Sequence, residues 1–300
     1  MQEQGVALIR ACRVLTHQGW VVGRGDCWLG EFHSWGNSPQ APIYNICTLK
    51  PARHLRGRTL NLAGLWADGN FFHWMLDVAT KAEIYRRALG DWSALDHILM
   101  PSLSTPTTRL IESNLGLPKE KILRLSAKDH YQCDELLVPS LPMAGGACFP
   151  WMVEFHRRLL APAQSDGTSR LFINRKCTRT IENHQEIALW LESKGFAEAS
   201  EDIEILRGQL ASATHIVGVH GAALTNLVYA RPGARLLELI PTSNPWPCFR
   251  TLAAAAGLAY AALGGQSLRH RRHRYGDNTT ANFVIKPAEF HTALAELLEE

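Results

Sequence analysis

The segment HIVGVHGAALTNLVYARPGARLLELIP, residues 215–241, limits the possible folds of this chain more than any other part of the sequence. It predicts a strand, a tight turn at His220-Gly221, a helix, a second turn and another strand. A strand, a helix and a second strand in this order form the repeating unit of a parallel sheet. The segment therefore predicts an α/β fold in this part of the chain.

Similar alternation runs through most of the sequence. Four further strands are predicted at RTLNLAGLW, DHILMP, KILRLS and YQCDELLVPSLP, and helices are predicted over residues 70–90 and 105–117. After residue 150 the alternation resumes and continues to FVIKPAEFHTALAELLEE, which predicts a strand and a terminal helix. The first fifty residues, rich in Trp, Gly and Pro, predict short strands and turns. We therefore expect parallel sheets with helices on both faces.

A Gly- and Pro-rich break at residues 142–150 is the best candidate for a domain boundary. We expect one domain over residues 1–148 and a second over 149–275. The strand and helix of residues 276–300 are candidates to pack back on the first domain. A length of 300 residues suits two such domains, and 46% hydrophobic with 20% charged residues excludes a disordered chain. The net charge of +3 is too small to indicate nucleic-acid binding.

The cysteines and the apolar segments bear on the compartment. Seven scattered cysteines without zinc-ligand spacing predict reduced, mostly buried thiols and a reducing compartment. The first fifteen residues lack the basic start and apolar run of a signal peptide. The longest apolar stretch, residues 252–265, is shorter than the roughly 20 residues that a membrane span needs. We therefore expect a cytoplasmic protein whose membrane contact is at most peripheral.

The turn at His220-Gly221 is a candidate anion site, because open α/β sheets bind ligands at the carboxyl ends of their strands. Gly221 allows a tight turn and a close approach, and the N–H groups of Ala222 and Ala223 are expected to point at the ligand. His220 would add a hydrogen bond. The alternative is a histidine at a strand end that binds no ligand. The turn is no dinucleotide fingerprint, because His220 stands where the second glycine of GxGxxG belongs.

Charged side chains follow two other predicted strands. Arg175 and Arg179 in LFINRKCTRTIEN suit a diphosphate, to which each guanidinium can donate two parallel hydrogen bonds. Surface arginines without a ligand are the alternative. Glu238 lies in the apolar run LLELI, where it could accept hydrogen bonds from ribose hydroxyls. A structural ion pair with a nearby arginine is the alternative for Glu238.

The segment GVHGAALTNLVYARPGARLLELIP closely resembles the signature of glycosyltransferase family 61. In that signature a G-x-H-G-A-x-L-T-N core precedes a P-G turn and an acidic strand. NFFHWMLD at residues 70–77 resembles the HW-x-x-D segment of that family, and NRKCTRTIENHQEI resembles its arginine-rich stretch. Gln209 stands where the family has a glutamine before the HGA strand, and ESKGF also fits the family pattern. The similarity therefore runs from about residue 60 to 265. Two departures, VAT at residues 78–80 in place of LPR and His184 in place of a glutamate, concern recognition of the acceptor.

The resemblance implies the GT-B architecture, in which two Rossmann-like domains face each other across a cleft and the C-terminal one binds a nucleotide-sugar. It also implies inversion at the anomeric carbon, with neither a cofactor nor a metal, and the sequence contains no DxD motif. Protein groups must then stabilise the leaving diphosphate. The expected donor-binding set comprises Arg175, Arg179, His220, Gly221, Ala222, Asn226 and Glu238.

Inverting transfer also needs a base that takes the proton of the acceptor hydroxyl. His73 and Asp77 are spaced i, i+4 on the helix predicted to begin after Asn70, so both face one way. We expect Asp77 to be the base, with His73 positioning it or serving as the base itself. The alternative is a structural His–Asp pair packed under Trp74.

The sequence thus predicts an inverting hexosyl- or pentosyltransferase that moves a sugar, from a UDP-sugar by expectation, to a glycan or lipid-linked glycan. We expect a role in bacterial surface-polysaccharide synthesis at the inner membrane. The basic run at residues 269–274 would contact a phosphate or an anionic membrane, with a solvated loop as the alternative. A catalytically silent nucleotide-sugar or glycan-binding protein of this fold is the main rival. A Rossmann-type oxidoreductase is less favoured, because it requires a glycine fingerprint that is missing.

Overall fold

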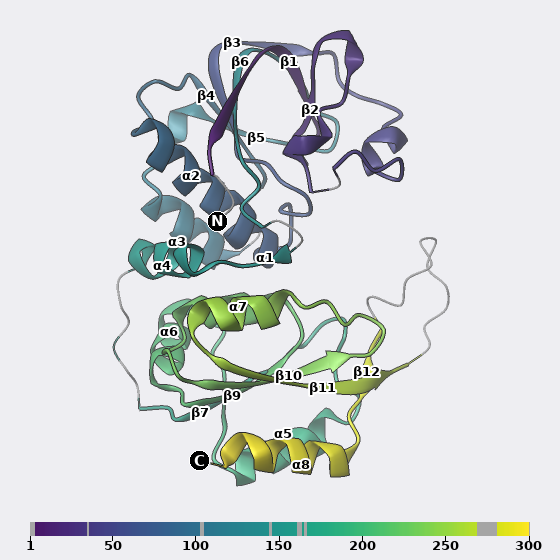
Figure 1. Ribbon diagram of the computed structural model, residues 1–300, viewed down its shortest axis with the longest axis vertical. Coiled ribbons are helices and arrows are strands. Elements are labelled where there is room, and N and C mark those ends of the chain that lie inside the picture. The colour runs from purple at the N-terminus through teal and green to yellow at the C-terminus, as the bar shows by residue number, and fades with distance from the viewer. Residues whose placement is uncertain are drawn as a thin grey trace. The chain divides into compact units, whose positions relative to one another are not determined.

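The computed structural model describes residues 4–34, 36–102, 105–143, 146–160, 164, 167–268 and 281–299. The chain forms two compact units, Met1–Gly145 and Gly146–Glu300, and each is built on a six-stranded sheet (Figure 1). Strands and helices alternate in both, so the predicted α/β class is confirmed. The second unit starts slightly before the expected boundary at residue 148, because the backbone N–H of Cys148 donates to Thr251 Oγ1 within that unit.

The described residues of the first unit form six strands, three α-helices and several short helical turns. Its strands are β1 (Val6–Leu15), β2 (Trp20–Val22), β3 (Arg53–Asn61), β4 (His97–Met100), β5 (Ile122–Arg124) and β6 (His130–Pro139). Its helices are α1 (Phe71–His73), α2 (Thr80–Leu89) and α3 (Pro106–Asn114). The strand order is β2-β1-β6-β3-β4-β5. The last four strands in this order run parallel, whereas β1 pairs antiparallel with both β2 and β6, so the sheet is mixed rather than parallel throughout.

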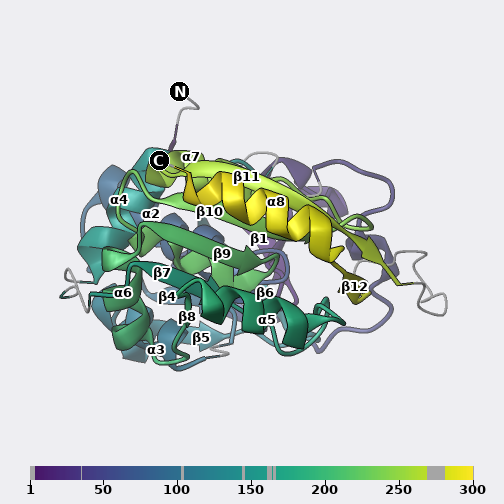
Figure 2. The same ribbon diagram turned by 90° about the horizontal axis from the view of Figure 1, so that it is seen from below.

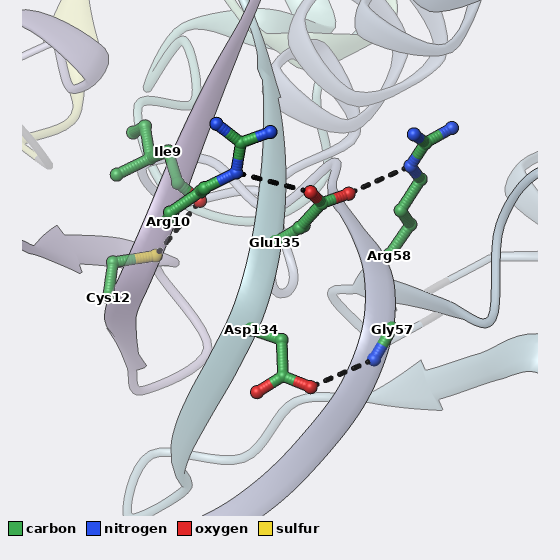
Figure 3. A network of polar contacts seen from close by, with 7 residues as sticks. All are labelled: Ile9, Arg10, Cys12, Gly57, Arg58, Asp134 and Glu135. Atoms are coloured by element: carbon green, nitrogen blue, oxygen red, sulfur yellow. Dashed lines mark hydrogen bonds and ion pairs between the residues drawn. The ribbon is translucent and has the colours of Figure 1, made fainter.

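Strand β1 is longer than the short strands expected near the N-terminus. Both arginines of this strand form ion pairs, and Arg13 contacts Asp26. Arg10 Nε lies 3.3 Å from Glu135 on β6, and Glu135 also accepts a 2.9 Å bond from Arg58 on β3 (Figure 3). The segments DCWLGEFHSWG and PIYNICTLK contain 3-10 turns at Gly30–Phe32 and Pro42–Asn45 instead of strands. Proline at the start of the second turn favours this geometry.

The helix predicted over residues 70–90 forms with a change of pitch inside it. Asn70 accepts a hydrogen bond from the N–H of Phe72 and caps the start, and Gly90 ends the helix with a φ of 90°. Between α1 and α2 the chain winds as a π-helix over Trp74–Ala79, all of which is buried. Such wider turns are rare and concentrate at functional sites.

The second unit contains a sheet that is parallel except at one edge. Its strands are β7 (Arg170–Ile173), β8 (Ala197–Glu198), β9 (His215–Val219), β10 (Arg235–Pro241), β11 (Ala259–Ser267) and β12 (Phe283–Val284). Its helices are α4 (Pro150–Leu159), α5 (His184–Ser193), α6 (Ile203–Ser212), the 3-10 helix η7 (Ala222–Tyr229), α7 (Cys248–Ala256) and α8 (Pro287–Leu298). Residues 222–229, expected as an α-helix, form the tighter 3-10 type. Among the described strands of this second sheet, only the edge strand β12 pairs antiparallel.

The strand order of this sheet is β12-β11-β10-β9-β7-β8. From β7 the chain adds β8 on one side and then places β9 and the later strands on the other side, so the order of addition reverses between β7 and β9. Helices α5 and α8 cover one face, and α6 and α7 cover the other (Figures 1 and 2). At such a reversal the loops that leave adjacent strands diverge to opposite faces and open a crevice at the carboxyl edge. The loops after β7 and β9 carry Arg175 and His220-Gly221, so the topology assigns the expected donor residues to this edge.

The C-terminal helix α8 belongs to the second unit, which corrects the suggestion that residues 276–300 pack on the first domain. Phe290 and Leu294 are buried in the same core cluster as Val217 of β9 and Leu237 of β10. The apolar stripe of α8 covers this sheet face together with α5, because parallel strands need cover on both sides. No helix in the described part of the chain has the length and apolar character to cross a membrane.

The position of α8 can be tested with Phe290→Ala, because the Phe290 side chain is fully buried. We expect a loss of about 3–5 kcal/mol in the free energy of unfolding, from lost burial and the cavity left behind. Hydrogen exchange measured by mass spectrometry should accelerate in peptides of β9 and β10. Leu189→Ala, at an exposed position of α5, is the matched control with little expected change. Faster exchange in the first unit alone would contradict this packing.

Candidate functional site

The guanidinium of Arg175 lies against the backbone of Gly221, which joins the loops after β7 and β9. A Cβ atom on Gly221 would collide with Arg175 Nη1. The backbone of Gly221 is extended, with a φ of 167°, so the position needs glycine for close approach and not for a tight turn as expected. Arg175 donates from Nε to the Thr178 carbonyl and from Nη2 to Thr178 Oγ1 at 3.1 Å. These bonds hold the guanidinium across the turn.

Arg179 lies close enough to Arg175 to affect its pKa. Burial, and secondarily the positive charge of Arg179, lower the pKa of Arg175 to about 10, and burial also lowers the pKa of Arg179. Arg179 has a φ of 59°, rarely adopted by a non-glycine residue, and its buried Nε has no hydrogen-bond partner among the described residues. Two partly desolvated cations side by side create a position that an anion would stabilise.

His220 and Glu238 form a buried pair at the same edge of the sheet. The Nδ1 atom of His220 lies 2.5 Å from Glu238 Oε1, and Tyr260 on β11 donates its hydroxyl to Glu238 Oε2 at 2.7 Å. Glu238 is completely buried. Burial and this hydrogen bond raise the pKa of Tyr260. Each oxygen of Glu238 therefore has a protein partner, and these partners are His220 and Tyr260, not the arginine of the alternative interpretation.

The pairing with Glu238 determines what His220 offers to a ligand. A carboxylate on Nδ1 favours a proton on that nitrogen and fixes the ring orientation, as carboxylates do for histidines that bind metals. The backbone N–H of His220 donates to the Leu239 carbonyl at 2.9 Å, and Phe249 packs edge-on against the ring. Glu238 and Phe249 therefore hold the imidazole ring while the backbone bond fixes the main chain, and Nε2 is the remaining polar atom of the ring for a ligand.

The start of η7 supplies the other two expected donor-side residues. Ala222 is the first residue of this 3-10 helix and is partly exposed. Asn226 is buried, donates from Nδ2 to the Ala223 carbonyl at 3.0 Å, and thereby braces the first turn. The buried oxygens of Asn226 and Thr225 have no hydrogen-bond partner in the described residues. The amide of Asn226 thus braces the turn after Gly221.

His73 and Asp77 of the first unit contact each other as their spacing predicts. His73 Nδ1 lies 2.8 Å from Asp77 Oδ2, and the exposed fractions of the two side chains are 18% and 7%. The π-helix begins at Trp74 and includes Asp77, so the pair spans the change of pitch. Trp74 is buried. The contact itself favours neither a catalytic nor a structural role.

Lys81 is a further member of this group that sequence reasoning missed. It is buried, and Nζ donates to the Ala63 carbonyl at 2.6 Å. Burial lowers the pKa of Lys81, and the negative charge of Asp77 opposes that effect. Lys81 follows Asp77 by one helical turn, which is the only signal that the sequence offers. The ammonium group ties the helix to the loop after β3.

The structure brings the predicted residues together in two groups, one in each unit. His73 and Asp77 form the group of the first unit. Arg175, Gly221, His220 and Glu238 form that of the second, with Arg179 nearby. The basic run at residues 269–274 lies outside the described residues.

Comparison with known proteins points to one family. The family model for glycosyltransferase 61 matches residues 71–237, a span that contains the His73–Asp77 pair and the His220-Gly221 turn. A xylan glycosyltransferase of Arabidopsis thaliana, MUCI21, is 29% identical over 103 residues, which cover 31% of this chain and 20% of that protein. The similarity therefore extends over about a fifth of the length of this relative.

A buried histidine beside Lys81 gives the first unit a specific pH dependence. His33 stacks on Trp20 with ring centroids 3.6 Å apart. Burial, and secondarily the positive charge of Lys81, lower the pKa of His33 from 6.5 to about 3. The folded chain therefore binds fewer protons at His33 than the unfolded chain does between these two pH values.

We expect the free energy of unfolding to decrease as the pH falls below about 6.5 and to keep decreasing until about pH 3. His33 should account for up to roughly 4 kcal/mol of this loss, and His33→Phe should remove that part of it. Urea unfolding at pH 7 and pH 4.5 measures the effect. His184→Phe, at an exposed position of α5 in the second unit, is the control and should behave like the wild type. Equal losses in the wild type and His33→Phe would contradict the assignment.

Proposed function

The chain belongs to glycosyltransferase family 61, and on this premise we propose that it is a metal-independent, inverting glycosyltransferase. In this proposal it moves a hexosyl or pentosyl group from a nucleotide-sugar to a glycan hydroxyl. The proposed nucleotide-sugar is a UDP-sugar. The observation that carries the proposal is the contact of Arg175 with Gly221 beside the buried His220–Glu238 pair. This arrangement concentrates cationic and hydrogen-bond donor groups at one edge of a parallel sheet, as a diphosphate requires.

On the donor side, the leaving nucleoside diphosphate gains negative charge as the bond to the sugar breaks. Arg175 and Arg179 offset this charge, and a protonated His220 Nε2 donates a hydrogen bond to a phosphate oxygen. Glu238 orients the His220 ring toward the donor through the 2.5 Å contact at Nδ1. The N–H of Ala222 and the side chain of Asn226, which braces the first turn of η7, complete the proposed donor set.

Preorganised protein groups take the role that a metal ion plays in other transferases, so we propose that none is needed. The described residues contain no cluster of three or more His, Cys, Asp or Glu side chains suited to hold a metal. The proposal is supported by the pair of cations, Arg175 and Arg179, because their burial disfavours the charged forms. Burial lowers the pKa values of Arg175 and Arg179, and a bound diphosphate would raise them again.

On the acceptor side, the His73–Asp77 pair supplies the base. The acceptor oxygen attacks the anomeric carbon, its proton passes to the base, and the nucleoside diphosphate departs from the opposite face. His73 is the more exposed member, with 18% of its side chain accessible against 7% for Asp77. This difference favours His73 as the group that accepts the proton, with Asp77 orienting the ring, over the reverse assignment.

The finer points of architecture and setting are also proposals. We propose a GT-B arrangement of two Rossmann-like units that face each other across a cleft, supported by the two α/β sheets and the family resemblance. The plant relative is named a xylan glycosyltransferase, which supports a polysaccharide or lipid-linked glycan as acceptor. A role in bacterial surface-polysaccharide synthesis, in the cytoplasm at the inner membrane, remains our proposal from the sequence. The rival, a silent binding protein, would bind nucleotide and transfer no sugar.

Donor binding is tested by thermal shift with UDP in the presence of EDTA. The wild type should gain stability with UDP through ligand linkage. In Gly221→Ala the added methyl group displaces the Arg175 guanidinium, so UDP affinity should fall roughly tenfold or more. Gly264→Ala, whose methyl group would meet Thr242 at 3.3 Å, is the matched control and should bind UDP like the wild type. Stabilisation of the wild type by NAD but by no nucleoside diphosphate would refute the donor assignment.

The base is tested by His73→Gln and Asp77→Asn. We expect His73→Gln to abolish transfer and Asp77→Asn to lower kcat by roughly 100-fold or more, because loss of general base catalysis has effects of this size. Both variants should keep the stabilisation by UDP, since neither residue belongs to the donor group. Radiolabelled sugar transfer and thermal shift provide the two readouts. Retained transfer in both variants would exclude the pair as the base.

A further inference from the structure

The loop between β3 and α1 presents an indole ring beside the His73–Asp77 pair. Trp66 packs edge-on against the His73 ring, with centroids 5.4 Å apart and an interplanar angle of 65°. More than half of Trp66, 53%, is exposed to solvent. The ring thus contacts the proposed base on one side and leaves an aromatic surface open on the other.

Folding does not account for this exposed indole. Trp20 and Trp74 are almost completely buried, with exposed fractions of 1% and 0%, and they supply the packing expected of tryptophan in this unit. The neighbours of Trp66 in the chain, Leu65 and Ala67, are buried as well. The loop is therefore anchored on both sides of Trp66, while the indole itself points outward.

The backbone at Trp66 is strained in addition. Its φ of 55° lies in the left-handed region, which a bulky side chain rarely adopts. The Ala67 N–H donates to the Gly64 carbonyl, and Gly64 lies 3.6–3.7 Å from Lys81 and Asp77 when measured from the position of its missing Cβ. The same loop thus connects Trp66 to the side chains that support the base. Strained residues of this kind concentrate where a side chain must point at a ligand.

A sugar ring is the ligand that suits an open indole at this position. The C–H groups on one face of a sugar ring carry slight positive charge, and the face of an indole is slightly negative, so the two stack. The hydroxyls at the sugar edge then remain free for hydrogen bonding and proton transfer. An aromatic ring beside a base can therefore orient an acceptor without consuming its hydroxyls.

We propose that Trp66 is the platform for the acceptor: a sugar ring of the acceptor glycan stacks on its indole, which brings a hydroxyl of that glycan to His73–Asp77. This inference rests on the proposed function, because it names a binding residue for the acceptor of that reaction. It assigns Trp66 to substrate positioning, not to proton transfer.

The test compares Trp66→Ala and Trp66→Phe with Tyr44→Ala, which removes another exposed aromatic ring from the same unit. The acceptors are xylo-, gluco- and manno-oligosaccharides of six sugars, with UDP-sugars as donors. Trp66→Ala should raise the acceptor KM roughly tenfold while the donor KM stays the same. Trp66→Phe should stay within about threefold of the wild type, because it keeps an aromatic face. Tyr44→Ala should match the wild type.

A second measurement reports binding without turnover. In protein labelled with 5-fluorotryptophan, the Trp66 resonance is assigned by its loss in Trp66→Phe, and addition of an oligosaccharide that serves as acceptor should shift it. An unchanged acceptor KM in Trp66→Ala, with normal transfer and UDP binding, overturns this proposal and leaves the proposed function standing. A Trp66 resonance that no oligosaccharide moves also overturns it. A wild type that neither binds UDP nor transfers sugar overturns both.

Discussion

The hydrogen bond between buried His220 and buried Glu238 is the interaction on which the proposed donor site depends. A carboxylate without any exposed surface must keep its partners, because removing one leaves an uncompensated group in the core. Glu238 on β10 has two such partners, His220 at the end of β9 and Tyr260 on β11. The polar contacts therefore join three adjacent strands at the edge where the turn of Gly221 meets Arg175. The buried carboxylate thus links the His220 ring to the core of the sheet.

Backbone strain occurs in both candidate groups. Trp66 and Arg179 have positive φ values although neither is glycine, and the π-helix of Trp74–Ala79 includes Asp77. Regular structure would be more stable at each of these places, so the packing around them must maintain the irregular geometry. Lys81 is one such support, because it is buried and bonded to the loop after β3. In both units the side chains proposed to meet substrate are thus held by buried polar groups behind them.

Local patterns in the sequence were enough to predict much of this arrangement. The i, i+4 spacing placed His73 against Asp77, and Asn70 was identified as the cap of their helix. The role of Glu238 could not be predicted, because its partners lie on neighbouring strands and their contact depends on strand order. Gly221 was expected for a tight turn and for close approach to a ligand; its extended backbone removes the first reason, and the approach of Arg175 is a tertiary contact that the sequence does not reveal. The π-helix and the burial of Lys81 have no clear local signal either.

The most direct test of this account is ¹⁵N NMR of histidine-labelled protein, with His220 assigned by His220→Gln. The account predicts that Nδ1 of His220 carries a proton bonded to Glu238 with and without UDP. It also predicts that UDP shifts the Nε2 resonance, because a phosphate oxygen of UDP accepts a hydrogen bond from Nε2. Glu238→Gln should weaken that response. UDP binding that leaves both ring nitrogens of His220 unchanged would contradict the account, because it would separate the nucleotide from the buried pair.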